Sequence, residues 1–193
     1  MSFINSFDLA AAEFAAAIAK NCGFFTTPLK IITLSGTAGA VFIVAAAMLI
    51  IFQRTRTTGI KAGGALLIGF IFTNLLLKNI IARPRPYADA TSRFYEIWQS
   101  AGALKESGFS FPSGHTTAAT AFGVSLFISL NKKYSWVFLF IPLVMGFTRI
   151  YFCVHYASDV LGGIVVGTTA AILSQSVYGF IMKKLSINAK NSN

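Results

Sequence analysis

Charged residues, and acidic ones above all, are scarce in this sequence. Its 193 residues include only six Asp or Glu against sixteen Lys or Arg, and charged residues make up 11% of the total. Soluble domains usually contain about 25% charged residues. Hydrophobic residues account for 55%, and the mean hydropathy is +0.67. The composition excludes an ordinary soluble domain and indicates an integral membrane protein, and the length suits one domain covering residues 1–193.

Cysteine is nearly absent, and its placement excludes two further classes. Cys22 and Cys153 lie far apart without metal-type spacing, so we infer neither a disulfide framework nor a zinc site. The N-terminus has no basic segment before an apolar run, so we expect no signal peptide. The net charge of +10 is typical of nucleic-acid partners, but the basic residues form no dense run. We therefore expect no nucleic acid as a partner.

Long apolar runs dominate what the sequence does contain. We expect an all-α integral membrane helical bundle of about five transmembrane helices, preceded by an N-terminal amphipathic interfacial helix. The expected spans cover residues 31–52, 60–77, 113–130, 134–150 and 155–182. Residues 82–112 form the longest polar loop, residues 131–133 form a basic turn, and Lys183, Lys184 and Lys190 lie in a polar tail.

Two patterns predict how individual helices are used. In residues 3–20, Phe3, Phe7, Phe14 and Ile18 fall on one helical face, so this short helix is expected to lie on the membrane rather than cross it. In the last span, two glycines four residues apart, within residues 163–167, predict close packing against another helix.

Charge is unequal on the two sides that five spans define. One side holds the loops after the first and third spans and the C-terminus, with eight basic residues and no acidic one. The other side holds the remaining eight basic residues and all six acidic ones, a balance of +2. The positive-inside rule places the first side in the cytoplasm. The N-terminal helix and the long loop then face outward from the cell membrane.

The stretch Phe111-Pro112-Ser113-Gly114-His115 joins the long loop to the third span. Ser113 is a good N-cap, and the free N–H groups and dipole of a first helical turn form an anion site. His115 stands in that turn, facing the anion. We interpret the stretch as a phosphate cradle with a proton donor beside it, with an ordinary capped helix start as the alternative.

Two further polar clusters fall at span ends on the same side. One contains Lys78 and Arg85, and the other contains Arg149, His155 and Asp159. Ionisable groups in apolar helices are costly, and their presence indicates function. The three cations Lys78, Arg85 and Arg149 together could neutralise the negative charge of a phosphate. A carboxylate four residues from an imidazole can fix its tautomer and leave the other nitrogen free to attack.

Each cluster also has a structural interpretation, which the residues alone leave open. The cations at the span ends could instead snorkel to the surface or bind lipid headgroups, alternatives that apply to Lys78, Arg83, Arg85 and Arg149. His155 and Asp159 could form a structural hydrogen-bonded pair. The membrane topology is inferred from loop charges that include none of these residues. That all three clusters are expected on one side of the membrane is therefore partly independent support for a common site.

Together the three clusters resemble the signature of the type-2 phosphatidic acid phosphatase superfamily. Three motifs occur with intact spacing over residues 78–159. The first is a lysine followed after six residues by Arg-Pro, and the second is Pro-Ser-Gly-His. The third is an arginine followed after five residues by a histidine and after three more by an aspartate. The resemblance implies that His155 is a nucleophile forming a phosphohistidine, that Asp159 orients it, and that His115 is the general acid. It also implies phosphate binding by Lys78, Arg85, Ser113, Gly114 and Arg149, and it implies no metal and no other cofactor.

The sequence departs from the family pattern at two points. Thr148 stands where the family commonly has serine, and it retains the hydroxyl. Many members have six spans, whereas five are expected here, with the amphipathic N-terminal helix in place of the first.

The resemblance predicts a membrane lipid phosphatase whose substrate is a phosphate or diphosphate monoester of a lipid. Undecaprenyl diphosphate is the first expectation, because compact members of this family often recycle that carrier. Phosphatidylglycerol phosphate and phosphatidic acid come next, then a lipid A phosphate. A small transporter or channel that uses the charged cluster as a permeation site is the alternative from another class. A vanadate-dependent haloperoxidase has a similar pocket but is soluble, unlike a chain with five spans.

Overall fold

The computed structural model describes residues 3–191, with side chains described through residue 188, and every regular element in that range is helical. The α-helices are α1 (Phe3–Asn21), α2 (Thr26–Ser35), α3 (Ala40–Ile51), α4 (Arg56–Phe70), α5 (Lys78–Ile81), α6 (Arg93–Ser100), α7 (Gly114–Ser129), α8 (Lys132–Ser135), α9 (Phe140–Tyr151) and α10 (Ala157–Asn191). Short 3-10 helices cover Gly23–Phe25, Thr37–Gly39, Pro86–Ala88 and Trp136–Leu139, and a π-helical segment covers Ile71–Leu77. The expected all-α class is confirmed.

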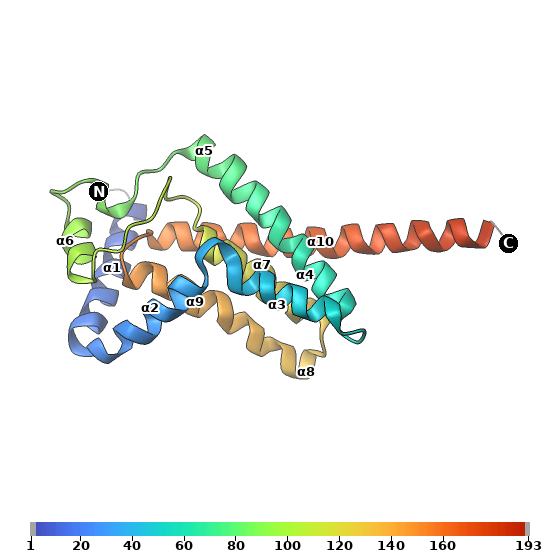
Figure 1. Cartoon of the computed structure of the whole chain (residues 1–193). Helices are drawn as coiled ribbons and strands as arrows, with labels where there is room; N and C mark the ends of the chain where they lie inside the picture. Colours follow the sequence, from blue (N-terminus) through green and yellow to red (C-terminus); the bar gives the residue numbers. More distant parts are fainter. Residues whose placement is uncertain (1–2, 192–193) are drawn as a thin grey trace.

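The bundle is organised around α7, which contacts α3, α4, α9 and α10 (Figure 1). Small and hydroxyl-bearing residues fill most of α7, and much of the helix is buried. The predicted packing through the glycines of α10 is confirmed, because a Cβ at Gly163 would stand 2.8 Å from the Ser113 carbonyl oxygen and one at Gly167 2.6 Å from the Thr117 carbonyl oxygen. Only glycine allows α10 to lie this close to the start of α7, and this contact sets the position of both helix ends.

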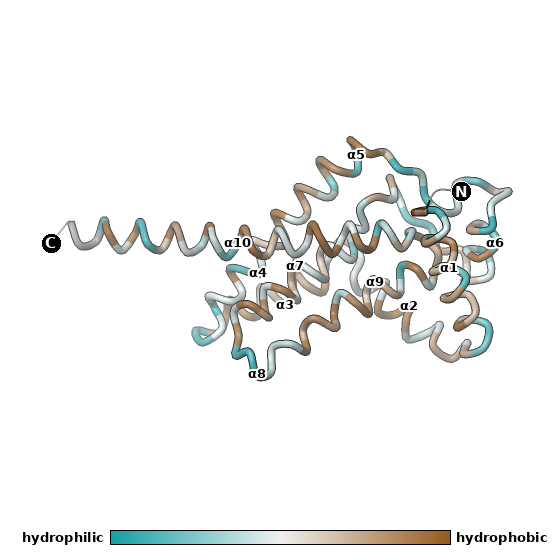
Figure 2. The backbone as a smooth tube through the Cα atoms, turned by 180° about the vertical axis from the view of Figure 1, so that it is seen from behind, coloured by the Kyte–Doolittle hydropathy of each residue, from teal (hydrophilic) through white to brown (hydrophobic). Residues whose placement is uncertain are grey.

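Apolar helices long enough to cross a membrane account for most of the expected spans. Within the described residues, three helical stretches qualify: Arg56–Ile81, Lys132–Tyr151 and Ala157–Asn188. A bent pair, Gly23–Ser35 with Thr37–Ile51, qualifies as a fourth. The expected span 113–130 corresponds to α7, whose 16 residues are fewer than the roughly 20 that a bilayer core requires. Figure 2 shows hydrophilic residues gathered at the two ends of the bundle, with apolar residues between them.

The first expected span, residues 31–52, is wrong in one respect, because it is not one continuous helix. The helical chain begins earlier, at Thr26 in α2, and breaks before α3 with a bend of 52°. Ala38 and Gly39 adopt positive φ angles of 52° and 72°, a conformation that ends a right-handed helix. The break divides the apolar run into two shorter helices.

The N-terminal helix α1 lies across one end of the bundle and contacts α6, α9 and α10 (Figure 1). Its expected aromatic stripe faces outward, since Phe3 is 87% and Phe14 65% exposed. The opposite face, with Asp8, Ala12 and Ala15, is buried. An aromatic face turned away from the protein fits a helix at the membrane surface.

Three expected irregular segments are more helical than the sequence predicted. The long loop 82–112 contains α6, which Ser92 caps by accepting a hydrogen bond from the Tyr95 amide. Two residues of the basic turn, Lys132 and Lys133, already belong to α8, which Asn131 caps. The expected polar tail continues α10 as a helix that projects beyond the bundle (Figure 1), although the side chain of Lys190 lies outside the described residues.

Candidate active site

The three motifs meet at the end of the bundle that carries α1. A cavity of about 730 Å³ opens there between α3, α4 and α7. Its polar end is lined by Lys78, Arg85, Glu106, Ser107, Gly114, His115 and His155. The structure therefore brings five of the eight predicted site residues to one cavity, with both imidazoles facing it. The other three, Ser113, Arg149 and Asp159, lie directly behind this lining, as their contacts show.

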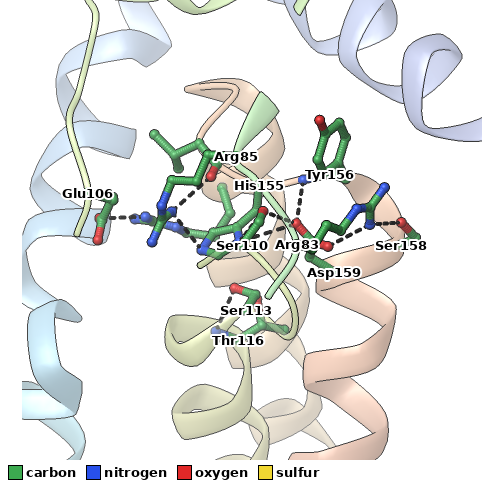
Figure 3. A network of polar contacts seen from close by, with 12 residues as sticks. Arg83, Arg85, Glu106, Ser110, Ser113, Thr116, His155, Tyr156, Ser158 and Asp159 are labelled. Carbon is green, nitrogen blue, oxygen red and sulfur yellow. Dashed lines mark hydrogen bonds and ion pairs between the residues drawn. The ribbon is translucent and has the colours of Figure 1, made fainter. Parts of the chain in front are cut away.

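His155 and Asp159 form the pair that their spacing predicted, but not on one helix. His155 lies in the turn between α9 and α10, and α10 begins only at Ala157, so the expected common helical face is wrong. The ring is instead turned back so that Nδ1 lies 3.4 Å from Asp159 Oδ2 (Figure 3). The Tyr156 amide donates to the same carboxylate oxygen at 2.9 Å, and Ser110 Oγ also donates to it. The carboxylate is fully buried and held on several sides.

This environment leaves His155 neutral with Nε2 directed at the cavity. Burial is the main cause that lowers the pKa of His155, to about 4, and the nearby charges of Arg149 and Arg85 act in the same direction. The hydrogen bond to Asp159 opposes them. A neutral imidazole with its Nδ1 proton directed at a carboxylate has its lone pair on Nε2. Such a nitrogen can act as a nucleophile at neutral pH.

Arg85 is fixed beside that nitrogen by backbone carbonyl groups. Its Nη1 lies 3.4 Å from His155 Nε2 and donates to the Val154 carbonyl at 3.0 Å. Its Nε and Nη2 donate to the carbonyls of Gly108 and Ser107 at 3.0 and 2.7 Å. The long loop thus orients the guanidinium toward His155 Nε2. Burial is the first cause that lowers the pKa of Arg85 from its ordinary value, although a guanidinium stays charged at neutral pH.

Ser113 and His115 begin α7 as the sequence predicted. Ser113 caps the helix, since its Oγ accepts from the Thr116 amide at 3.4 Å and from Thr116 Oγ1 at 2.9 Å (Figure 3). His115 is buried, and no described residue offers a hydrogen-bond partner to its Nε2. Buried polar atoms are nearly always paired, so this nitrogen is suited to a ligand in the cavity.

The break between α2 and α3 makes room for His115. A Cβ at Gly36 would lie 2.5 Å from Met145 Cε and 3.2 Å from His115 Cδ2. Residues 36–39 line the same cavity as the imidazole. Two glycines within an apolar run were the available signal for this break, which sequence reasoning read as part of one span.

Lys78 stands opposite the helix start, where the π-helical segment ends. Its Nζ would be 3.8 Å from a Cβ placed on Gly114. Thr73 in the π segment donates to Thr117 Oγ1 at 3.1 Å, which joins this segment to α7. π-Helical turns occur often at functional sites, because they change the direction of the residues that follow. Here the residue that follows is Lys78.

Arg149 is buried at the end of α9 and is paired with Glu106. Its Nη2 lies 2.5 Å from Glu106 Oε1, its Nη1 donates to Thr33 Oγ1, and no described residue pairs with its Nε. Burial raises the pKa of Glu106, but the charge and hydrogen bond of Arg149 outweigh this, so the pKa lies below its ordinary value. Glu106 is therefore ionised at neutral pH, at the polar end of the cavity, where the other charged lining residues are the cations Lys78 and Arg85.

Glu106 competes with any anion for Arg149, which leads to a testable prediction. Replacing Glu106 by glutamine keeps its size and removes its charge. We expect the KM for an anionic substrate and the inhibition constant of inorganic phosphate to fall together by about 3- to 10-fold, equivalent to roughly 1 kcal/mol. Steady-state kinetics with and without added phosphate would measure both.

The matched control for this variant is Glu96→Gln. Glu96 is also a carboxylate paired with an arginine, but the pair with Arg93 is exposed on α6, away from the cavity. We expect its kinetic constants to match the unmodified protein. A KM that rises in Glu106→Gln would contradict the competition and would make Glu106 a support for Arg149 instead.

Sequence reasoning missed four polar residues of this region. Ser110 and Glu106 lie in the long loop, Arg83 lies two residues before Arg85, and Asp8 lies on α1. Tyr87 fixes Glu106 by accepting from its amide and donating to its carbonyl, both at 3.0 Å. No sequence spacing connects Asp8, Ser110 or Glu106 to the motifs, whereas Arg83 lies inside the first motif and was considered only as a possible ligand of lipid headgroups. The part of the chain that the structure describes has no group of three His, Cys, Asp or Glu side chains able to hold a metal ion.

Away from its polar end the cavity is apolar. It runs between α3 and α4, where its lining includes Ile43, Ile50, Leu66, Leu67 and Phe70. A cavity with cations and two histidines at one end and apolar side chains along the rest suits a lipid that carries a phosphate group. The polar end holds two imidazoles and the cations Lys78 and Arg85, with Arg149 directly behind them, and such groups are suited to phosphoryl transfer.

Comparisons with known proteins agree with this geometry. The sequence profile of the PAP2 superfamily matches residues 58–183. The undecaprenyl-diphosphatase of Sulfolobus acidocaldarius is 30% identical over 141 residues, which cover 71% of this chain and 63% of that protein. The undecaprenyl-diphosphatase BcrC of Bacillus subtilis is 34% identical over 106 residues, which cover 55% of this chain and 51% of that protein. The chain thus spans between about half and two thirds of the length of these curated relatives.

A solved structure is similar over nearly the whole chain. It is the transmembrane PAP2-type phosphatidylglycerolphosphate phosphatase from Bacillus subtilis, with a TM-score of 0.69 and 26% sequence identity. The match covers 95% of this chain and 88% of that one. The profile covers all three motifs and the helices from α4 through most of α10, and the solved structure extends the likeness to the N-terminal helices. This chain belongs to the PAP2 superfamily.

Proposed function

We propose that this protein is a membrane lipid phosphatase that hydrolyses a phosphate or diphosphate monoester through a phosphohistidine. The observation that carries the proposal is the cavity itself, in which two imidazoles and the cations Lys78 and Arg85 share one end and apolar side chains form the rest. Spontaneous hydrolysis of phosphate monoesters is very slow, so catalysis must lower the barrier by roughly 20 kcal/mol or more. Positioning and charge stabilisation are the main means available to a protein for this reaction.

The first step forms a bond between His155 Nε2 and phosphorus while the bond from phosphorus to the leaving oxygen breaks. His115 donates a proton to that oxygen, so the product leaves as an alcohol or, for a diphosphate, as a lipid monophosphate. In the second step, water attacks phosphorus after giving a proton to His115, and the bond to His155 breaks to release phosphate. Asp159 accepts a hydrogen bond from Nδ1 and stabilises the positive charge that the ring gains.

The remaining predicted residues bind the phosphoryl group. Lys78, Arg85 and Arg149 surround the negative charge of the three phosphoryl oxygens, and Gly114 offers an amide at the start of α7. Ser113 holds that helix start in place through its cap. Arg85 already lies next to His155 Nε2, so an oxygen of the attacked phosphate can be bound as the nucleophile approaches. These cations supply the positive charge that metals provide in other phosphatases, which supports a metal-independent reaction.

The apolar part of the cavity supports a lipid as the substrate. A chain lying between α3 and α4 would contact the side chains of both helices, with its phosphate at the cationic end. Undecaprenyl diphosphate is the substrate we favour, because two curated relatives have the name undecaprenyl-diphosphatase. Phosphatidylglycerol phosphate follows, from the name of the similar solved structure, and phosphatidic acid after it.

The charge balance of the loops supports a site on the outer side of the cell membrane. The connections between α3 and α4 and between α7 and α9, at the end opposite the polar end of the cavity, carry Arg54, Arg56, Lys132 and Lys133. Cytoplasmic loops are enriched in such residues. The proposal therefore places the cavity and α1 at the extracytoplasmic surface and the C-terminal end of α10 in the cytoplasm.

Phosphate release from a panel of lipids tests the function directly. The purified protein in detergent is offered undecaprenyl diphosphate, phosphatidylglycerol phosphate, phosphatidic acid and a lipid A phosphate, and kcat/KM is compared. We expect undecaprenyl diphosphate to give the highest value, and we expect the same rates after treatment with EDTA. Activity that EDTA abolishes and Mg²⁺ restores would contradict the metal-independent reaction. Absence of phosphate release from every lipid would favour the alternative of a transporter or channel.

A further inference from the structure

The N-terminal helix contributes a buried carboxylate to the region behind the cavity. Asp8 is 1% exposed and accepts three hydrogen bonds, each of 2.8 Å. Two come from the amide and hydroxyl of Ser158 at the start of α10, and the third comes from Arg83 Nη2. A buried charge is costly unless it is paired and hydrogen-bonded. Asp8 is thus the polar centre of the contact between α1 and α10, on the face opposite to the aromatic stripe.

Arg83 connects this carboxylate to that of Asp159. Its Nη2 donates to Asp8. Its Nη1 donates to Asp159 Oδ1 and to Ser158 Oγ, both at 2.7 Å (Figure 3). The guanidinium also lies over the ring of Tyr156, 3.9 Å from its centroid. The planar fork of arginine can bind two carboxylates in fixed geometry, which lysine cannot do. A continuous path of contacts therefore runs from α1 through Arg83 and Asp159 to His155.

Neither Asp8 nor Arg83 is placed to bind substrate. They are absent from the described residues that line the cavity. The terminal nitrogens of Arg83 are already bonded to protein oxygens, which argues against the alternative that this arginine binds lipid headgroups. Their side chains reach the pair of His155 and Asp159 through the bond of Arg83 to Asp159.

We propose that Asp8 and Arg83 are positioning residues for the proposed phosphatase, holding Asp159 in the orientation that aligns His155. The inference rests on the proposed function of His155 as the nucleophile. Asp8 balances the charge of Arg83, so that Arg83 fixes one oxygen of Asp159 without drawing the other away from the imidazole. Partners that orient a functional side chain in this way commonly affect activity by about 10- to 100-fold.

Asp8→Asn tests the proposal, because it keeps the size of the side chain and removes the charge that faces Arg83. We expect kcat to fall by about 10- to 100-fold. We expect KM to stay within about twofold, because the cavity lining is untouched. Arg83→Lys keeps the positive charge but cannot bridge two carboxylates, so the same pattern is expected. A general loosening of the fold would change KM and the melting temperature as well.

Glu13→Gln is the matched control. Glu13 lies on the same helix and also pairs with an arginine, but its contact with Arg93 is 3.6 Å long and exposed. We expect this variant to keep the kcat, KM and melting temperature of the unmodified protein. It therefore separates loss of the path to Asp159 from loss of a carboxylate on α1.

A readout independent of activity comes from the two histidines, which are the only ones in the sequence. ¹⁵N-histidine NMR in detergent distinguishes the two neutral tautomers of each ring. We expect His155 to carry its proton on Nδ1 and to show a mixture of tautomers in Asp8→Asn. An unchanged tautomer together with an unchanged kcat would overturn the proposal. A changed tautomer in a protein that hydrolyses none of the lipids would support the positioning path and refute the proposed function instead.

Discussion

His155→Ala is expected to abolish phosphate release, with a loss of about 10⁴-fold or more, because no other described group stands where the nucleophile must be. The unmodified protein should also yield an acid-labile phosphoenzyme when it is quenched during turnover of ³²P-labelled substrate. The variant should yield none. Rapid quenching followed by gel analysis measures the intermediate, and a phosphate-release assay measures turnover.

The variant has to remain folded for this result to be informative. Cys153→Ala is a suitable control, since Cys153 lies in the same turn as His155 and packs against the buried cluster under α6 and α9. It is expected to stay active within a few-fold of the unmodified protein. Melting temperatures in detergent should agree between the two variants. Normal turnover by a folded His155→Ala protein would refute the assignment of the nucleophile.

His115→Gln is expected to produce the second large effect, and that effect should depend on the leaving group. Glutamine approximates the size of histidine but cannot deliver a proton at neutral pH. For a lipid phosphate the leaving oxygen is an alkoxide that needs a proton, so we expect kcat to fall by about 10² to 10⁴-fold. For an aryl phosphate such as p-nitrophenyl phosphate the leaving group needs little help, so we expect a loss of less than about tenfold.

The two substrates serve as internal controls for each other. A variant that misfolds, or in which the phosphate is bound badly, would lose activity on both to a similar extent. Equal losses on the lipid and aryl substrates would therefore contradict a role for His115 in protonating the leaving oxygen. Measuring kcat for both substrates with the same preparation decides between these outcomes.

The sequence predicted which motifs meet better than it predicted the bounds of the helices that carry them. The spacings of the three motifs reflect local needs, such as a capped helix start at Ser113 and a carboxylate four residues after His155. Those needs are visible in neighbouring residues, and the structure brings the motifs to one cavity. Even so, the local reason given for His155 and Asp159 was wrong, because a turn and not a helical face brings them together.

Helix boundaries were harder to predict, because apolar composition alone does not show where a helix bends. Residues 31–52 are uncharged throughout, yet α2 and α3 are separate helices. His115 and Met145 approach Gly36 at this break, and that contact joins residues far apart in the sequence. Composition reports whether a segment can lie in a membrane and says little about its tertiary contacts.

The contacts of Asp8 and Glu106 lay beyond sequence reasoning for the same reason. Asp8 lies 75 residues from Arg83 along the chain, and Glu106 lies 43 residues from Arg149. An acidic residue on a surface helix or in a polar loop usually faces solvent. Burial against a specific arginine is a property of the assembled bundle and leaves no periodic pattern in the sequence.

The long projection of α10 also bears on how the protein can be handled. A helix of 35 residues is about 52 Å long, whereas the hydrocarbon layer of a bilayer is about 30 Å thick. Every described side chain after Tyr178 is exposed, so the final turns gain nothing from tertiary contacts. Fluorophores, affinity sequences or crystallisation partners attached there would stand several nanometres from the reacting groups.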